Sequence, residues 1–347
     1  MTKIAIHHTP GSFSDRWIAY CDAQRINYKV VNCYQSDILK QLEDCDALMW
    51  HFNHKDSKDS KFAIQLLNAV QCSGKKVFPD YHTAWHFDDK LAQKYLFESL
   101  ELPHAATHVF YSPKDAKEWI KSAYFPTVFK LRNGSGSDNV KLVRSGVKAK
   151  KLVSKAFSKG FKQYEGWSNL KERIRKFRVG KASVWDVVKG FIRLIYPTKY
   201  ARVTGREKGY AMFQDFIPGN DHDIRVVVIG DKAVAIKRLV RDHDFRASGS
   251  GFIEYDKELF KESTIQLSFD ISKKMNTQCV AFDYVFKNGE PLLVEVSYGF
   301  SPIGYDPCPG YWDESLTWYE GGFDMYGWMV EDIIASVKKN KVINAEL

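Results

Sequence analysis

Several features that would place this chain in a special class are missing from it. Its six cysteines include no Cys-x-x-Cys pair, and a chain of 347 residues does not need disulfide staples, so we expect reduced thiols. No apolar run approaches the ~18–20 residues of a membrane-spanning helix. The start, Met1–His8, lacks the long apolar stretch of a secretory signal, so the cytoplasm is the expected setting. Internal repeats and low-complexity runs are also absent, which excludes a fibrous protein.

The chain has enough apolar residues to form more than one packed domain. Hydrophobic residues make up 44% of it and aromatic residues 14%. A chain of this length and composition is too long for one ordinary core and too apolar to be disordered. We therefore expect two or three domains.

Charge is distributed unevenly along the chain. The formal net charge is +9, but residues 147–209 hold 18 Lys/Arg and 4 Asp/Glu, a net of +14, which leaves −5 for the rest. Within this basic segment, residues 182–196 are predicted to form a basic amphipathic helix. Its apolar stripe consists of Trp185, Val188, Phe191, Ile192 and Ile195. Three interpretations stay open: the segment lies on an anionic membrane surface, grips an anionic polymer, or is a solvated insertion.

The first hundred residues alternate short apolar runs with stretches of helical spacing. The expected strands are residues 3–7, 28–31, 45–50 and 76–78, and the expected helices are residues 15–24, 36–42 and 61–73. Strands separated by helices of this length indicate a parallel sheet with helical crossovers.

Strand-like segments dominate the chain after a helix predicted over residues 89–100. They are residues 127–130, 211–214, 224–229 and 233–236, followed by a hairpin of residues 279–286 and 292–297. The pattern therefore indicates antiparallel sheets in this part of the chain.

A glycine-rich turn follows the strand that ends in Lys130. Its residues are Gly134, Ser135, Gly136 and Ser137. Such a turn can bring backbone N–H groups onto anionic oxygens, next to a cation that reaches the same phosphate. The alternative is an ordinary hairpin turn beside an exposed lysine.

Two carboxylates, Asp283 and Glu295, lie among apolar residues on the two strands of the last hairpin. Two carboxylates buried together repel each other unless a divalent cation lies between them. A two-residue Asn288-Gly289 loop would pair Asp283 with Val294, so the metal interpretation requires a three-residue loop that ends at Glu290. The alternative is that one carboxylate faces solvent.

A third element runs from Met212 through two arginine-bearing strands. Apolar side chains beside the backbone of residues 214–217 could hold a flat purine, and Arg225 and Arg238 stand where they could meet phosphate. Either arginine could instead form an ion pair with Asp221 or Asp223.

The order of these elements resembles the ATP-grasp superfamily, within it the branch of ribosomal-protein glutamate ligases and glutathione-synthetase-like enzymes. The resemblance runs from about Asp80 to Ser301. It implies an α/β fold (an α+β grasp): a parallel α/β pre-grasp domain (residues 1–88), a central grasp subdomain (89–215) that carries the basic insertion, and a C-terminal grasp subdomain (216–347).

The resemblance also implies roles for the nucleotide-facing residues. Lys90 and Lys130 are similar to the two nucleotide lysines of the family, and residues 134–137 to its mobile phosphate-covering loop. The adenine-holding hinge is matched by Gln214, Asp215, Phe216 and Ile217.

Further residues resemble those around the transferred phosphate and the carboxylate substrate. Arg225 and Arg238 match the strand arginines, and Arg246 and Ser248 match a stretch that lines the substrate and triphosphate region. Asp283 and Glu295 match the magnesium ligands. Ser297 departs from the family pattern, which usually has Asn there; its hydroxyl can ligate a metal but reaches less far.

The activity implied by the resemblance is amide formation from a carboxylate and an amine, driven by ATP and Mg²⁺ through an acyl-phosphate. The segment 298–328 carries ten aromatic residues, which suit stacking on sugar rings or packing of a C-terminal subdomain. Together with the basic segment, they suggest a uronic-acid-containing surface glycan as acceptor and peripheral attachment to a membrane.

Other functions stay open at this point. The chain could join free amino acids or peptides, or bind ATP as a non-catalytic scaffold. An RNA-binding role would rest on the basic segment alone, and no recognisable nucleic-acid module supports it, so nucleic acid is not expected as a partner.

Overall fold

The structure is a computed structural model that describes residues 2–53, 56, 58–133, 139–162, 170, 173–174, 177, 183–195, 205–240 and 252–346. The chain divides into two compact units. The first unit comprises Met1–His54, Lys58–Ala105 and Ile217–Leu347, and the second comprises Lys55–Ser57 and Ala106–Phe216. The domain boundaries expected after residues 88 and 215 stay predictions.

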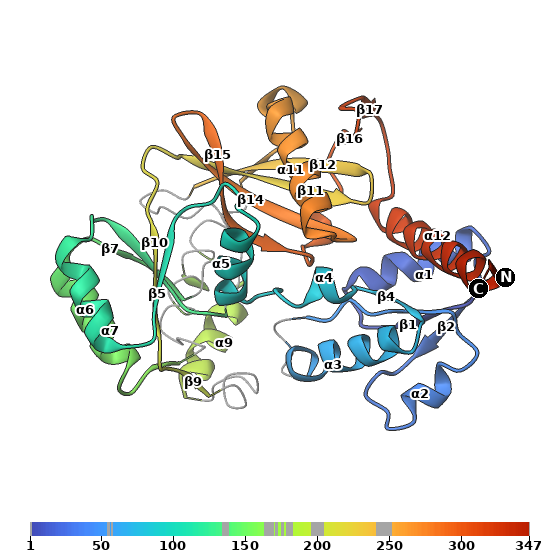
Figure 1. Cartoon of the computed structure of the whole chain (residues 1–347), viewed down its shortest axis with the longest axis horizontal. Helices are drawn as coiled ribbons and strands as arrows, with labels where there is room; N and C mark the ends of the chain where they lie inside the picture. Colours follow the sequence, from blue (N-terminus) through green and yellow to red (C-terminus); the bar gives the residue numbers. More distant parts are fainter. Residues whose placement is uncertain are drawn as a thin grey trace. The chain divides into compact units, whose positions relative to one another are not determined.

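The first unit begins with a four-stranded parallel sheet, drawn in blue in Figure 1. Its order is β2-β1-β3-β4, from β1 (Ile4–His7), β2 (Tyr28–Val31), β3 (Ala47–Met49) and β4 (Lys76–Phe78). The intervening helices are α1 (Phe13–Ala23), α2 (Ile38–Gln41) and α3 (Asp59–Cys72), and α4 (Tyr81–Ala84) follows β4. The sequence alternation thus forms the parallel sheet with helical crossovers that it predicts.

A larger antiparallel sheet completes the first unit. Its order is β15-β14-β11-β12-β16-β17, with the short β13 also paired to β12. The strands are β11 (His222–Ile229), β12 (Lys232–Leu239), β13 (Ile253–Glu254), β14 (Cys279–Lys287), β15 (Glu290–Ser297), β16 (Gly310–Asp313) and β17 (Trp318–Glu320). Helices α5 (Lys90–Ser99) and α11 (Glu262–Met275) and the short turns η1 (Lys257–Leu259) and η2 (Pro302–Gly304) accompany it.

Successive residues of β11 enter two different cores, because side chains alternate between the faces of a strand. Val226 and Val228 pack with Phe269 of α11. Val227 and Ile229 belong instead to the core of the N-terminal sheet, which also contains Trp17 of α1. The large sheet and the N-terminal sheet therefore share one hydrophobic core.

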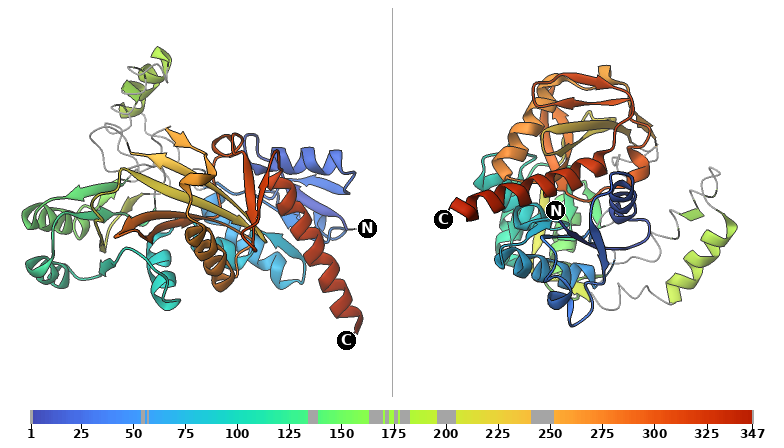
Figure 2. Two further views of the ribbon diagram at one scale, coloured as in Figure 1. Left: turned by 90° about the horizontal axis from the view of Figure 1, so that it is seen from above. Right: turned by 90° about the vertical axis from the view of Figure 1, so that its right-hand side faces the viewer.

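The last helix, α12 (Met325–Glu346), closes this shared core. Met329 and Val330 are buried in it, and the first part of α12, red in Figure 2, packs against α1, drawn in blue. Gly327 permits this approach because a Cβ at that position would collide with the ring of Tyr20 on α1. None of the helices in the described ranges is long and apolar enough to cross a bilayer.

The second unit is built on a four-stranded antiparallel sheet of order β5-β10-β6-β7. The strands are β5 (Thr107–Phe110), β6 (Thr127–Lys130), β7 (Val140–Val143) and β10 (Ala211–Asp215). Helices α6 (Pro113–Ser122) and α7 (Gly146–Ala156) bury Ala116, Ile120 and Val153 in its core. A short pair, β8 (Phe161–Lys162) and β9 (Arg206–Glu207), and α9 (Val184–Ile195) complete the described part of the unit.

Candidate functional site

On one face of the large sheet, charged side chains follow the apolar ones at the edge of the shared core. Val227 and Ile229 of β11 are in that core, and Arg225 and Asp223 follow on the same face toward the start of the strand. The register places Asp283 of β14 opposite Arg225, and Arg238 of β12 opposite Asp223. Four charged groups thus meet on one face of three adjacent strands, and all lie in the first unit.

We call these charged groups the ionic row. Glu295 joins the ionic row through a β-bulge. Lys287 pairs with Glu290, so the hairpin loop is the two-residue Asn288-Gly289 turn, and the expected three-residue loop is wrong. The register then shifts between Tyr284, which faces Leu293, and Asp283, which faces Glu295. One extra residue on a strand turns the following side chains to the other face. The bulge therefore brings the two carboxylates together, as the longer loop would have done.

Both oxygens of Asp283 accept hydrogen bonds from arginines. Arg225 donates from Nη2 to Oδ2 at 2.8 Å and from Nε to Oδ1, and Arg238 Nη2 lies 2.9 Å from Oδ2. Arg238 also donates to both oxygens of Asp223, at 2.6 and 2.7 Å. These are fork-shaped, charge-assisted contacts between buried groups. Of the ion pairs that the sequence left open, Arg238 forms the one with Asp223, whereas Arg225 pairs with Asp283 and not with Asp221 or Asp223.

The ionic network separates the pKa values of the two aspartates. Burial opposes ionisation of Asp283, but the Arg225 and Arg238 guanidiniums outweigh it and lower the pKa to about 2. Burial prevails at Asp223 and raises its pKa, against the opposing effect of Arg238. Asp283 is therefore fully ionised at neutral pH, as a metal ligand must be.

Lys90 reaches the same row from the first turn of α5. Asp89 caps this helix by accepting from the N–H groups of Leu91 and Ala92, at 3.1 and 3.0 Å, which fixes where the helix begins. Lys90 Nζ lies 3.1 Å from Oε1 of Glu295. Burial would lower the pKa of Lys90, but Glu295 and Asp88 reverse this and raise it. The lysine is a buried, permanent cation beside the carboxylate pair.

The carboxylate pair suits a magnesium ion that arrives with a nucleotide. In the described ranges, no group of three His, Cys, Asp or Glu side chains is placed to hold a metal on its own. Mg²⁺ commonly takes one or two carboxylates and completes its shell with phosphate oxygens and water. Asp283 and Glu295 fit that donor set. The Ser297 hydroxyl donates to the carbonyl of Gly299 at 2.7 Å, which leaves its lone pairs for a metal or a metal-bound water.

Two of the predicted nucleotide residues lie on neighbouring strands of the second unit. Lys130 ends β6 as a buried side chain opposite Met212 of β10. Gln214 is fixed on both sides, since its side chain donates to Thr107 at 3.1 Å and its carbonyl accepts from Thr127 at 2.8 Å.

The rest of the predicted hinge lies at the end of β10. Asp215 donates its N–H to the carbonyl of Ala106 and lies 3.3 Å from His108, while Phe216 and Ile217 follow the strand at the division between the units. The roles of these residues in nucleotide binding stay predictions.

The remaining predicted residues lie outside the described ranges. They are Gly134, Ser135, Gly136, Ser137, Arg246 and Ser248. The structure places none of them, so their roles also stay predictions.

Sequence reasoning missed Tyr305, which is buried beside the ionic row. Its charged surroundings include Arg225, Arg238 and Asp283. Its hydroxyl has no hydrogen-bond partner in the described part of the chain. The only signal in the sequence was membership of the aromatic segment 298–328, which does not distinguish one tyrosine from another.

Comparison with solved structures identifies the fold. A RimK domain protein of the ATP-grasp kind from Sphaerobacter thermophilus aligns over 96% of this chain and 100% of its own, with a TM-score of 0.56 and 14% identity. D-alanine–D-alanine ligase from Bacillus anthracis, solved in complex with ATP, covers 97% and 98%, with a TM-score of 0.58 and 12% identity.

A third neighbour was solved with metal and nucleotide. The ATP-grasp ligase PsnB, in complex with a minimal precursor, Mg and ADP, covers 97% of this chain and 98% of its own, with a TM-score of 0.54 and 10% identity. The chain has the ATP-grasp fold, so the predicted α/β grasp architecture is confirmed.

A family model matches part of the chain to one branch of the ATP-grasp proteins. Residues 200–301 match the model described as a RimK-like ATP-grasp domain, the branch suggested by the sequence motifs. This region contains the arginine strands and the three carboxylates of the row, Asp223, Asp283 and Glu295. No curated protein sequence matches the chain.

Proposed function

We propose that this protein is an ATP- and Mg²⁺-dependent ligase that joins a carboxylate to an amine. The observation that carries the proposal is the partly buried row in which Asp283 and Glu295 face each other between Lys90, Arg225 and Arg238. The structural neighbours crystallised with ATP, or with Mg and ADP, support the same cofactors.

In this reaction the protein must align the substrates and supply positive charge, and it needs no nucleophilic side chain. A carboxylate oxygen takes the γ-phosphoryl group of ATP and ADP leaves; the amine nitrogen then attacks the acyl carbon, phosphate leaves and an amide forms. Magnesium, when bound, neutralises phosphate charge. Lys90 and Arg238 would hold the phosphates in a site fixed in advance.

The test is ADP and phosphate release by the purified full chain. Pools of carboxylates and amines are supplied separately and together, with ATP and Mg²⁺. We expect sustained release only with both pools present, because the acyl-phosphate formed with the carboxylate alone has no amine to react with, and mass spectrometry should find an amide product. Calorimetry adds a second check, because Mg²⁺ should bind tightly only with a non-hydrolysable ATP analogue present. Sustained release over many turnovers without any amine, or no release in any pool, would contradict the proposal.

The finer proposal is that the acceptor is a uronic-acid-containing glycan and that the protein works at a membrane surface. Helix α9 supports the second part. Trp185 is 72% exposed, and Phe191 and Ile192 are also exposed, on a helix that carries Lys189 and Arg193. An apolar stripe flanked by cations is typical of helices that lie on anionic lipid. The first part rests on the rings of the aromatic segment 298–328 that are not buried, such as the exposed Tyr319, because five of the ten aromatic side chains pack in the cores.

A non-catalytic ATP-binding scaffold is the second candidate. One observation favours it: both Asp283 oxygens are already engaged by arginines, so a metal would have to share them. Tight ATP binding without phosphate release, in every pool of acceptors, would favour the scaffold over the ligase.

A further inference from the structure

Strand β15, which carries Glu295, is the outermost of the described strands on its side of the large sheet. The N–H and C=O groups on the open side of an edge strand need partners outside the sheet. At Leu293 the main chain after α5 supplies them, because the Leu293 N–H donates to Pro103 and its C=O accepts from Ala105, both at 2.9 Å. The bulge that follows shifts the alternation, so the next residue with its main chain turned to the open side is Val296.

The partner of Val296 is the side chain of Gln93 on α5. Its Nε2 donates to the Val296 carbonyl at 2.8 Å, and its Oε1 accepts from the Val296 N–H at 3.3 Å. The same Nε2 also donates to the carbonyl of His86 at 3.0 Å. A glutamine amide has two N–H donors and one acceptor oxygen, so each polar atom of this buried side chain is engaged. Gln93 thus takes the place of a neighbouring strand at one residue, and we call its two bonds to Val296 the Gln93 clamp.

The clamped residue lies directly between Glu295 and Ser297. Lys90 stands one helical turn before Gln93 on α5, so the two side chains share a face of the helix. Lys90 Nζ lies 3.1 Å from Oε1 of Glu295. Helix α5 therefore holds β15 at two adjacent points, by an ion pair to a side chain and by the clamp on the main chain.

The ion pair and the clamp constrain Glu295 differently. A lysine ammonium is a compact charge on a flexible stem, so it attracts Glu295 without fixing the direction of the carboxylate. The clamp is directional, because two hydrogen bonds from one amide reach one residue and oppose sliding of β15 along α5. Asp283, on the neighbouring strand, is held separately by Arg225 and Arg238. The clamp therefore acts on the position of Glu295 relative to Asp283.

We propose that Gln93 is a positioning residue of the metal site, which holds Glu295 opposite Asp283 and against Lys90 by clamping Val296. The inference rests on the proposed function for the magnesium ion. It goes beyond that function because it assigns a role to a neutral side chain that is not itself a ligand. Partners that orient a metal ligand in this way typically contribute about 10- to 100-fold to metal affinity.

The first test is calorimetric titration of Mg²⁺ into the full chain saturated with a non-hydrolysable ATP analogue. Gln93→Met keeps the approximate volume of the side chain but removes its three hydrogen bonds. We expect its Mg²⁺ affinity to fall about tenfold. An affinity equal to that of the wild type would overturn the proposal. If circular dichroism shows that Gln93→Met does not fold, Gln93→Asn is measured in its place, because its amide is one methylene too short to reach Val296.

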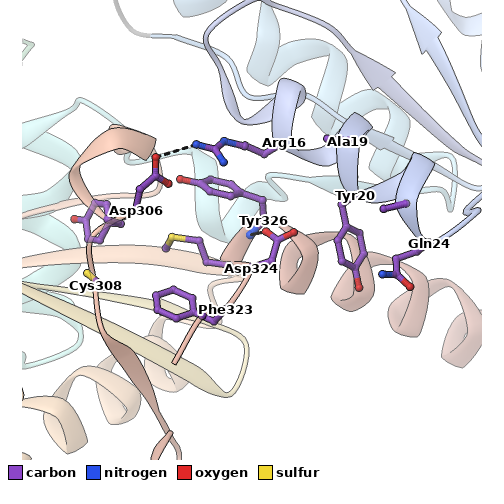
Figure 3. A pocket seen from close by; sticks show the side chains of 13 residues that line it. Arg16, Ala19, Tyr20, Gln24, Asp306, Cys308, Phe323, Asp324 and Tyr326 are labelled. Carbon is purple, nitrogen blue, oxygen red and sulfur yellow. Dashed lines mark hydrogen bonds and ion pairs between the residues drawn. The ribbon is translucent and has the colours of Figure 1, made fainter. Parts of the chain in front are cut away.

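The matched control is Tyr20→Phe, which removes a hydrogen bond between two other elements of the same unit. The Tyr20 hydroxyl on α1 donates to Glu331 of α12. Figure 3 shows Tyr20 at a pocket of about 560 Å³, and the described residues that line this pocket include none of the ionic row. Tyr20→Phe should therefore bind Mg²⁺ like the wild type. A purely structural role of Gln93 predicts instead that both variants lose stability and that neither loses Mg²⁺ affinity, and this pattern would overturn the proposal.

The second test needs no ligand. The coupling between Lys90 and Glu295 is measured by a double-mutant cycle of urea unfolding with Lys90→Met and Glu295→Gln. The cycle is run in the wild type and again in Gln93→Met. If the clamp positions Glu295, the coupling should fall by about half or more when the clamp is removed.

This second test separates the clamp from the ligase proposal. Unchanged coupling would overturn the role of Gln93, even in a protein that turns over ATP. A wild type that binds no Mg²⁺ with the ATP analogue would contradict the proposed function, whereas reduced coupling in the same protein would still support the positioning of Glu295 by Gln93.

Discussion

Asp283 accepts hydrogen bonds from two arginine side chains, and its negative charge holds both guanidiniums in place. Arg238 is buried and Arg225 is partly buried, and both guanidiniums stay protonated at any working pH. Removing the single carboxylate between them leaves two buried cations only partly compensated by Asp223. Breaking a buried ion network in this way costs about 3–5 kcal/mol.

We therefore expect Asp283→Asn to lower the free energy of unfolding at pH 7 and to change its pH dependence. The folded pKa of about 2 lies below the value of about 3.9 in unfolded chains. The stabilisation is thus present above pH 4 and is lost as the pH falls toward 2, by about 2 kcal/mol. Urea unfolding at pH 6, 4 and 2.5 should show this loss in the wild type and not in Asp283→Asn. The exposed Asp270→Asn is the control, and equal slopes in all three proteins would contradict the assignment.

Glu295 tests the metal site with less cost to the fold, because it is only partly buried. We expect Glu295→Gln to reduce ATP turnover by at least about 100-fold, the usual loss when one preorganised electrostatic contact is removed. Circular dichroism should remain native. Glu290→Gln, an exposed residue on the same strand, should keep full turnover. Retained activity in Glu295→Gln would remove the carboxylate from the metal site.

The sequence predicted which residues form the row but not how they pair. Asp283 and Glu295 were recognised by their apolar neighbours, a local signal. The pairing of Arg225 with Asp283 depends on β11 meeting β14, which lies about 50 residues further along the chain. Tyr305 gave no local signal at all. Contacts of this kind arise from tertiary packing, which the period of a single strand does not encode.

Among the elements, the β14–β15 hairpin sets the geometry of the carboxylates. Asn288 and Gly289 have φ values of 54° and 85°, as the two-residue turn with two left-handed residues requires. The bulge that follows near Val294 then corrects the register. A sequence pattern of strict alternation cannot predict a bulge, and this is why the expected loop length was wrong while the expected pairing was right.

We expect Gly289→Ala to destabilise the protein by about 1 kcal/mol through backbone strain alone. A Cβ at this position would contact only the Lys261 ammonium, at 3.8 Å, so no clash contributes. The left-handed conformation of Gly289 is the reason for the cost. Thermal unfolding measures it, with Gly304→Ala as the control, because a Cβ there meets nothing and no positive φ is involved. An equal effect in both variants would argue against the turn assignment.

On the scale of the whole molecule, the net positive charge comes from residues 147–209, while the remainder carries a slight net negative charge. Lys90, Arg225 and Arg238, the cations that we propose to face the phosphates, all lie outside that segment. ATP binding therefore does not explain the excess of basic residues. Helix α9 is the described apolar face of this segment, and the membrane surface that we propose as its partner would account for the excess.

We expect the protein to co-sediment with vesicles of phosphatidylcholine and phosphatidylserine, and to be released as salt rises from 50 to about 500 mM, because salt screens the attraction. Trp185→Ser should weaken binding several-fold. Tyr124→Ser, which changes an aromatic residue that is 93% exposed on the same unit, should not. Binding to neutral vesicles that is insensitive to salt would contradict an electrostatic contact.

The shared core of the first unit has a consequence for how the protein is made. Phe13 and Trp17 of α1 pack in one core with Met329 and Val330 of α12, about 300 residues later in the chain. At the ribosome's rate of ~5–20 residues per second, the N-terminal sheet waits tens of seconds for that helix. During this interval its apolar surface is open to chaperones and to other nascent chains. The yield of folded protein should therefore depend on synthesis conditions more than its final stability would suggest.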